Sequence, residues 1–246
     1  MAHLRRLSRA PIVEALVDFR VAANPKLTRE QFEPIKAALK SRYPKAEEQR
    51  RFEGQFAFDS GRVDAKSRDL GFWGIFLRSE DNEWLSQFRT DGFTVNRLGR
   101  YEGADQLFSE ARSLWALYVE HLRPEQVTRV ALRYINRPGF PWRLGDEFSR
   151  FLTAAPIVPP EAPQSTSAFL TKVVTHDEGS GATAVVTQRV DTEPKGPATV
   201  IDVDVFRESE FGTGMDLLEP ELQRLRDLKN RIFFSLLTDA AIKELE

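Results

Sequence analysis

Charged side chains on strand-like segments are the residues of this chain best suited to chemistry. In residues 200–205, Asp202 and Asp204 alternate with branched apolar residues, so both carboxylates project from one face of a strand. Two other segments carry a pair of charges at even spacing, one pair acidic and one basic. Together these segments supply the candidate ligand-binding residues: Glu14, Asp18, Arg129, Arg133, Asp202 and Asp204.

Two interpretations of these charges stay open. If the strands curve into a cup, paired carboxylates can hold Mg²⁺ while arginines bind phosphate with two hydrogen bonds each. The chain is then a metal-dependent enzyme or sensor that acts on a phosphorylated or nucleotide ligand, with Mg²⁺ as its cofactor. If the face is solvated, the same charges pair across neighbouring strands as ordinary ion pairs. We favour the second interpretation, because clusters of charge mark functional sites only part of the time.

Other catalytic centres find little support in the sequence. The absence of cysteine excludes disulfides, thiol catalysis and zinc sites with sulfur ligands. The histidines His3, His121 and His176 lack the His-x-His or His-x-x-x-His spacing of a metal site. No serine stands in a Gly-x-Ser-x-Gly motif, and no phosphate-binding loop is present. We therefore assign no catalytic residue and no metal ligand, and the cofactor is unknown.

Residues 133–138 form the densest polar and aromatic segment. Tyr134 and Asn136 could contact a ligand at the end of their strand. We favour a core position for the Tyr134 ring with its hydroxyl group in water, and a capping role for Asn136 at the turn into Pro138.

The elements that carry the charges follow from periodicity. Residues 12–21 alternate as a strand, with apolar side chains on one face and Glu14 and Asp18 on the other. Thr28 is predicted to cap a helix that runs to about Arg42, with Gln31 in the capping-box position. Three strands and an amphipathic helix are then predicted at residues 51–58, 70–79, 84–90 and 103–122.

The second half of the chain repeats this succession. A strand is predicted at residues 127–136 and a short helix at residues 145–154, followed by a proline-rich surface loop at residues 156–163. Three strands and a long amphipathic helix follow at residues 168–176, 182–190, 198–207 and 216–237. We expect Ile201, Val203 and Val205 to face the helices.

An internal repeat is the main statement that the sequence makes about architecture. Residues 87–93 resemble residues 205–211, each segment precedes a long helix, and residues 11–21 stand at nearly the same offset from residues 127–136. Each half, 1–123 and 124–246, is therefore predicted to be β-α-β-β-β-α, and the halves to form one continuous domain. Short turns favour antiparallel pairing, so we predict an α+β fold: a mainly antiparallel sheet with its helices packed on one face.

Composition narrows the class of partner. The 35 basic and 37 acidic residues give a net charge of −2, so no overall field attracts nucleic acid, and we predict no nucleic-acid ligand. No apolar run reaches the roughly 20 residues of a membrane helix. The first residues are basic but lack the apolar segment of a signal peptide. We expect a cytoplasmic protein.

Five segments carry a resemblance to a known family. They are Pro-Ile-Val-Glu-Ala at 11–15, Gly-Phe at 92–93, Leu-Arg-Tyr-Ile-Asn at 132–136, Ile-Asp-Val-Asp-Val-Phe at 201–206 and Lys-Asn-Arg-Ile-Phe-Phe at 229–234. Together they resemble a sporadically distributed, functionally uncharacterised bacterial family of proteins of about 250 residues, over nearly the whole chain. The resemblance implies no activity, cofactor or catalytic residue. Its patchy distribution is typical of accessory genes and is compatible with a role in host defence.

These observations favour a non-catalytic binding or accessory interaction protein of unknown ligand. The adjacent Phe233 and Phe234 carry the apolar surface of the C-terminal helix beyond a single stripe. We therefore expect a second chain, either a partner protein or another copy in a homodimer.

Overall fold

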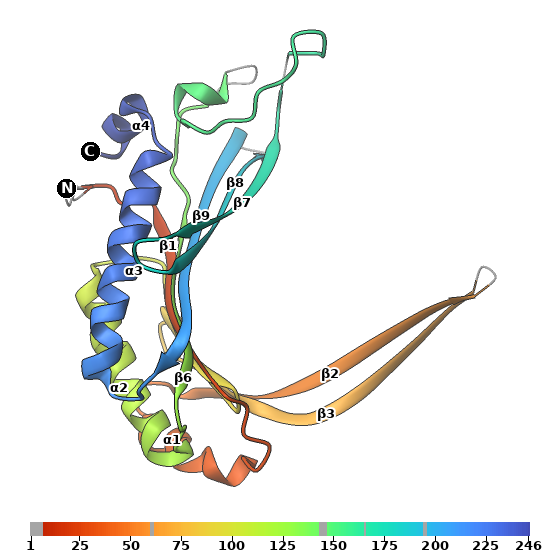
Figure 1. Ribbon diagram of the computed structural model, residues 1–246, viewed down its shortest axis with the longest axis vertical. Helices are drawn as coiled ribbons and strands as arrows, with labels where there is room; N and C mark the ends of the chain where they lie inside the picture. The colour runs from red at the N-terminus through yellow and green to blue at the C-terminus, as the bar shows by residue number, and fades with distance from the viewer. Residues whose placement is uncertain (1–6, 60–61, 143–146, 165, 194–195) are drawn as a thin grey trace.

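One nine-stranded antiparallel sheet forms the body of the protein, and α-helices cover one of its faces (Figure 1). The computed structural model describes residues 7–59, 62–142, 147–164, 166–193 and 196–246. The order of strands across the sheet is β2-β3-β4-β5-β1-β6-β9-β8-β7. The predicted α+β class is confirmed.

The bounds of the elements follow the chain. The strands are β1 (Ile12–Val21), β2 (Lys45–Asp59), β3 (Arg62–Arg78), β4 (Trp84–Arg89), β5 (Gly92–Leu98), β6 (Val127–Asn136), β7 (Phe169–Asp177), β8 (Ala182–Glu193) and β9 (Gly196–Phe211). The helices are the 3₁₀ turn η1 (Arg29–Gln31), α1 (Glu33–Leu39), α2 (Ala104–Leu122), the 3₁₀ turn η2 (Phe148–Arg150), α3 (Met215–Ser235) and α4 (Asp239–Leu245). Thr28 is the N-cap residue as predicted, and its backbone N–H donates to Gln31 Oε1 at 2.6 Å. The predicted continuous helix to about Arg42 is instead divided into η1 and α1, and α1 ends at Leu39.

The two halves of the chain use the same strand order. β1 and β6 lie side by side in the middle, and outward from them the order is β5, β4, β3 on one side and β9, β8, β7 on the other. Helix α2 contacts β1 and β5, and α3 contacts the corresponding strands β6 and β9. This is the strand order expected of two repeats related by a twofold axis. Strand β2 is an addition to the first half.

The similar segments at residues 87–93 and 205–211 do not occupy equivalent positions. The first forms a hairpin, in which Arg89 of β4 pairs with Gly92 of β5, whereas the second lies inside β9. The two residues between Arg89 and Gly92 reverse the chain, so the first half gains β5, a strand that the sequence pattern had not separated. The two halves therefore share their strand order, but the two similar segments do not occupy equivalent positions in it.

The predicted helix at residues 145–154 is also different. Residues 143–146 lie outside the described residues, and the segment that follows forms only the single turn η2. Its aromatic side chains instead join a cluster: Phe151 stacks on Phe140 at 4.7 Å between ring centroids, and Trp142 meets both Phe148 and Phe151 edge to face. Packing of these rings decides the local backbone more than helix propensity does.

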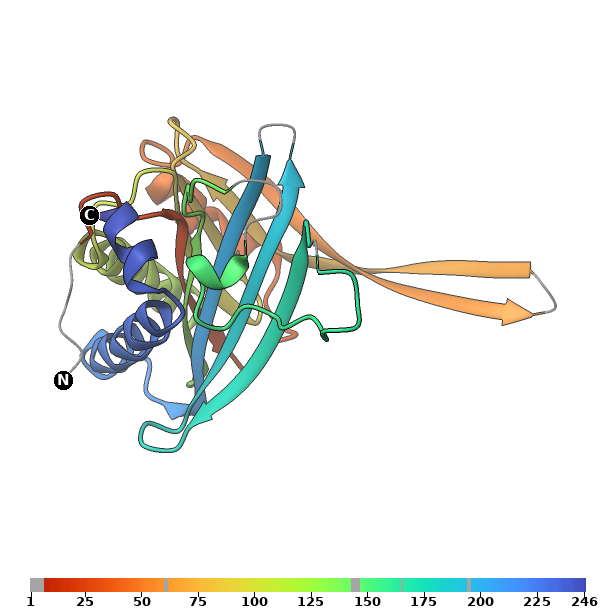
Figure 2. The same cartoon turned by 90° about the horizontal axis from the view of Figure 1, so that it is seen from above.

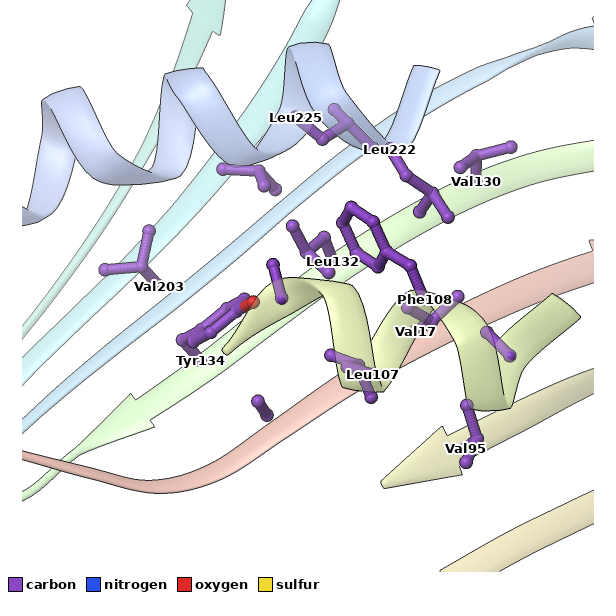
Figure 3. Packing of buried hydrophobic residues seen from close by; sticks show 14 of the residues in the cluster. Val17, Val95, Leu107, Phe108, Val130, Leu132, Tyr134, Val203, Leu222 and Leu225 are labelled. Carbon is purple, nitrogen blue, oxygen red and sulfur yellow. The ribbon is translucent and has the colours of Figure 1, made fainter. Parts of the chain in front are cut away.

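The core lies between the helices and one face of the sheet. Figure 3 shows Phe108 of α2 and Leu222 of α3 directed toward Val17, Val130 and Leu132 of the two central strands. Alternation places the predicted residues of β9 as expected, because the apolar ones are fully buried on the helix side: Ile201, Val203 and Val205. Phe233 is buried and Phe234 packs against the same core, so this pair does not form the exposed apolar surface that we had expected.

The sheet is curved, and a long hairpin leaves it on the side away from the helices (Figures 1 and 2). Strand β3 pairs with β4 only over Gly74–Arg78, so residues 50–59 and 62–72 pair only with each other. We call these two stretches the arm. Register shifts interrupt the β2–β3 ladder just before Arg50 and just after Arg51, where the arm departs, and Gly71, opposite Arg51, has φ +92°. Bulges of this kind bend a strand, and glycine adopts that φ without strain. Among the described residues, no helix is long and apolar enough to cross a membrane.

Candidate functional site

The six candidate residues all lie on the sheet face opposite the helices. On β1, Asp18 lies between the buried Val17 and Phe19, and its side chain therefore points to the other face. The same alternation applies on β6 and β9. We call this surface the charged face, which is formed by β4, β5, β1, β6 and β9 and carries Glu14, Asp18, Arg129, Arg133, Asp202 and Asp204.

Asp18 is the centre of the charged face. Its Oδ2 accepts hydrogen bonds from Arg89 at 2.9 Å and from the Thr94 hydroxyl at 2.7 Å, and its Oδ1 accepts one from Arg129 at 2.9 Å. Asp18 is only 8% exposed, and Arg89 and Thr94 are buried as well. A buried carboxylate is stable here because two guanidinium groups and a hydroxyl group replace its water.

Arg133 and Asp202 form the second pair. Arg133 donates two hydrogen bonds to the two carboxylate oxygens of Asp202, at 2.8 and 2.5 Å. These hydrogen bonds raise the pKa of Arg133 above its ordinary value. The backbone register places Arg133 directly opposite Asp204, so the bidentate pair runs diagonally across the two strands.

Asp204 and Glu14 are held less tightly. Asp204 lies 3.6 Å from Arg129, and burial raises the pKa of its carboxyl group, although the charges of Arg129 and Arg133 act in the opposite direction. Glu14 accepts a hydrogen bond from Asn96 of β5 at 2.5 Å. The six candidates thus form three separate groups: Asp18 and Asp204 around Arg129, Arg133 with Asp202, and Glu14 with Asn96.

Aromatic rings contact two arginines of the charged face. The guanidinium carbon of Arg129 lies 4.3 Å from the centroid of the Phe206 ring, and that of Arg89 lies 5.6 Å from Trp73. Such contacts favour a cation, and they restrict the guanidinium planes to a few orientations. Each of these two arginines is therefore held both by a carboxylate and by a ring.

Sequence reasoning missed Arg89, Thr94 and Asn96. Arg89 alternates with the buried Phe88 in β4, a signal that was present in the sequence. The other two belong to β5, and their contribution depends on the pairing of β5 with β1, in which Thr94 lies opposite Asp18.

Most charges of the charged face are neutralised by a neighbouring charge of opposite sign. Three of the four carboxylates have an arginine within 4.0 Å, and the fourth binds an amide. A phosphate group would compete with a carboxylate for each of these arginines. Among the described residues, no group of three His, Asp or Glu side chains is placed to hold a metal ion.

A second unusual cluster lies on the helix side, around Tyr134 of β6. Its hydroxyl group is buried, not in water as predicted, and lies 2.7 Å from the hydroxyl group of Tyr101. Lys229 of α3 lies with its Nζ 3.8 Å from the centroid of the Tyr134 ring. Asn136 donates to the Ile201 carbonyl group at 3.1 Å, so it joins β6 to β9.

No family model, curated protein or solved structure matches this chain. The resemblance to the sporadically distributed bacterial family stays a prediction. Function is therefore inferred from the contacts of this chain alone.

Proposed function

We propose that this protein is a cytoplasmic, non-catalytic binding protein that docks a partner protein with its arm and charged face. A protein with an accessory role, including one in host defence, is consistent with this proposal. The observation that carries it is the arm, a two-stranded ribbon that projects from the sheet beyond the contact of Phe72 with Phe32 at its base.

Keeping the arm ordered costs conformational entropy that few contacts offset. Ten residues of extended strand reach about 30 Å, and a two-stranded ribbon is at best marginally stable in water. Its base is stabilised by the ion pair of Arg50 with Asp69 at 2.5 Å and by Arg51 over the Trp73 ring. At this same level of the ribbon, where Phe52 pairs with Asp69 and Leu70 follows Asp69, Phe52 is 62% exposed and Leu70 is 46% exposed. Large exposed apolar side chains on a projecting ribbon favour a contact with another protein.

The charged face supports the same function. The arm projects from the side of the sheet on which the charged face lies, so both can contact one partner (Figures 1 and 2). The partly exposed side chains of this face include both signs of charge, since Arg133 is 40% and Asp204 27% exposed, and charges in fixed positions suit the polar part of a protein interface. We therefore infer a folded protein partner with an apolar depression for Phe52 and Leu70 and a mixed-charge surface beside it.

Site-specific photocrosslinking in cells tests this proposal. A photoreactive residue replaces Phe52 in one variant and Leu217, an exposed apolar residue of α3 on the helix side, in the matched control. We expect one major adduct of defined mass from position 52 and none of that mass from position 217. The identified partner, purified, should bind the wild type in isothermal titration, and Phe52→Asp should weaken binding at least tenfold while Leu217→Asp should not.

Three results would overturn the proposal. Equal adducts from the two positions would remove the role of the arm. An adduct with a second copy of this chain alone would replace the partner protein by a homodimer. Micromolar binding of a nucleotide with Mg²⁺ that disappears in Arg133→Ala would favour the metal-dependent enzyme or sensor.

A further inference from the structure

Strand β7 forms one edge of the sheet, at the end opposite β2. All nine of its residues pair with β8 without a register shift. An edge strand with a regular ladder presents a row of free N–H and C=O groups on its outer side, and these groups are a template for another strand.

Apolar side chains accompany this free edge on both faces. Leu170 is 70% exposed, Val174 52% and Val173 51%. Val173 lies opposite Val186 on the helix side, whereas Val174 lies opposite Val185 on the side of the sheet that bears the charged face. The usual protection of an edge is weak here: β7 contains no proline and a single lysine, Lys172.

We propose that two copies of this chain form a homodimer by antiparallel pairing of their β7 strands. A twofold axis perpendicular to the sheet keeps the helices of both copies on the same face, and each residue then lies opposite one of the same face. An axis at Val173 places Val173 opposite its own copy and Thr171 opposite Thr175. Lys172 then lies opposite Val174, and no like charges oppose each other.

Charge selects this register over the one with its axis at Lys172. An axis at Lys172 would place two ammonium groups directly opposite each other, which is unfavourable. In the Val173 register the exposed valines of both copies come together, and the lysine stems cover part of them. The strand is therefore complementary to itself, and this property is why a second copy is the inferred occupant of the edge.

Because the chain contains no cysteine, a single introduced cysteine can form a disulfide only with its copy in the other chain, which tests the register. In Val173→Cys, the two sulfurs of a dimer face each other across the axis, within the Cα separation that a disulfide needs. In the matched variant Thr171→Cys, the two copies are separated by four residue steps, about 14 Å along the strands. Under mild oxidation we expect rapid covalent dimer from Val173→Cys and at least tenfold slower dimer from Thr171→Cys.

Light scattering after size exclusion tests the dimer independently. We expect a dimer for the wild type at micromolar concentration, a monomer with unchanged circular dichroism for Val173→Asp, and a dimer for the arm variant Phe52→Asp. A monomeric wild type up to high micromolar concentration, or equal disulfide rates for the two cysteine variants, would overturn the inference. Dissociation by Phe52→Asp but not by Val173→Asp would assign the dimer to the arm instead. Failure of the arm to bind a partner protein leaves these outcomes unchanged, so the two proposals fail separately.

Discussion

A lysine inside the core allows the change in the free energy of unfolding with pH to be worked out. Lys229 belongs to α3, and its side chain points from this helix toward β6 and is only 7% exposed. Its Nζ lies over the Tyr134 ring and 2.6 Å from Asn230 Oδ1. Burial lowers the pKa of Lys229 to about 7, and the positive charge of Arg226 acts in the same direction. The amine is therefore half neutral in the folded protein near neutral pH, and cationic in the unfolded chain.

The sign of the pH effect follows from linkage. Between pH 7 and pH 10.5 the unfolded chain binds a proton at Lys229 that the folded protein lacks, so protonation favours unfolding. The free energy of unfolding should rise by about 1.4 kcal/mol per pH unit over this range, and the penalty at pH 7 amounts to roughly 4 kcal/mol. The raised pKa values of Tyr43, Tyr118 and Tyr134 act only above pH 10, where the tyrosines of the unfolded chain ionise.

Lys229→Met removes the charge and keeps the length of the side chain. Loss of the cation–π contact costs about 1–2 kcal/mol, so we expect the variant to be about 2–3 kcal/mol more stable than the wild type at pH 7. Its stability should be nearly independent of pH between 7.5 and 9.5, whereas that of the wild type should rise. Urea unfolding followed by tryptophan fluorescence at half-unit steps of pH measures both.

Arg226→Gln is the matched control, because it removes a neighbouring charge and leaves the buried amine in place. It should retain most of the rise in stability with pH. A wild type whose free energy of unfolding is flat between pH 7.5 and 9.5, or a methionine variant that is less stable at pH 7, would refute the assignment of a neutral buried amine.

Three further substitutions separate buried from exposed contacts, each measured by urea unfolding. Asp18→Asn leaves the buried guanidinium group of Arg89 and the partly buried one of Arg129 without their shared carboxylate and should cost about 3 kcal/mol or more. A cost below about 1 kcal/mol would show that water already screens this network. Arg133→Ala, at a half-exposed pair, should cost only about 0–1 kcal/mol. Gly74→Ala should cost about 2 kcal/mol or more, because a Cβ there would lie 2.2 Å from the Phe88 carbonyl oxygen; an unaffected transition would contradict this β3–β4 contact.

Side-chain periodicity was sufficient to predict the class of the fold and the faces of its strands. The alternation of Val203 with Asp202 and Asp204 separates a core face from a polar face whatever the strand pairs with, because a strand places successive side chains on opposite sides. The helical stripe of α3 was equally visible. Lys229 interrupts that stripe four residues after Leu225, a signal of a buried cation that could have been found.

The tertiary structure alone decided which charges meet. Partners such as Arg89 and Asp18 are 71 residues apart in the chain, and their contact requires β4, β5 and β1 to be neighbours in one register. The arm and the free edge of β7 depend on the same information, since a strand pattern does not state where its pairing ends. Local pattern records which face a side chain occupies, because that choice is made by the residue and its immediate neighbours. Register and strand order are set by the summed burial of the whole sheet, and so they belong to no single segment of the sequence.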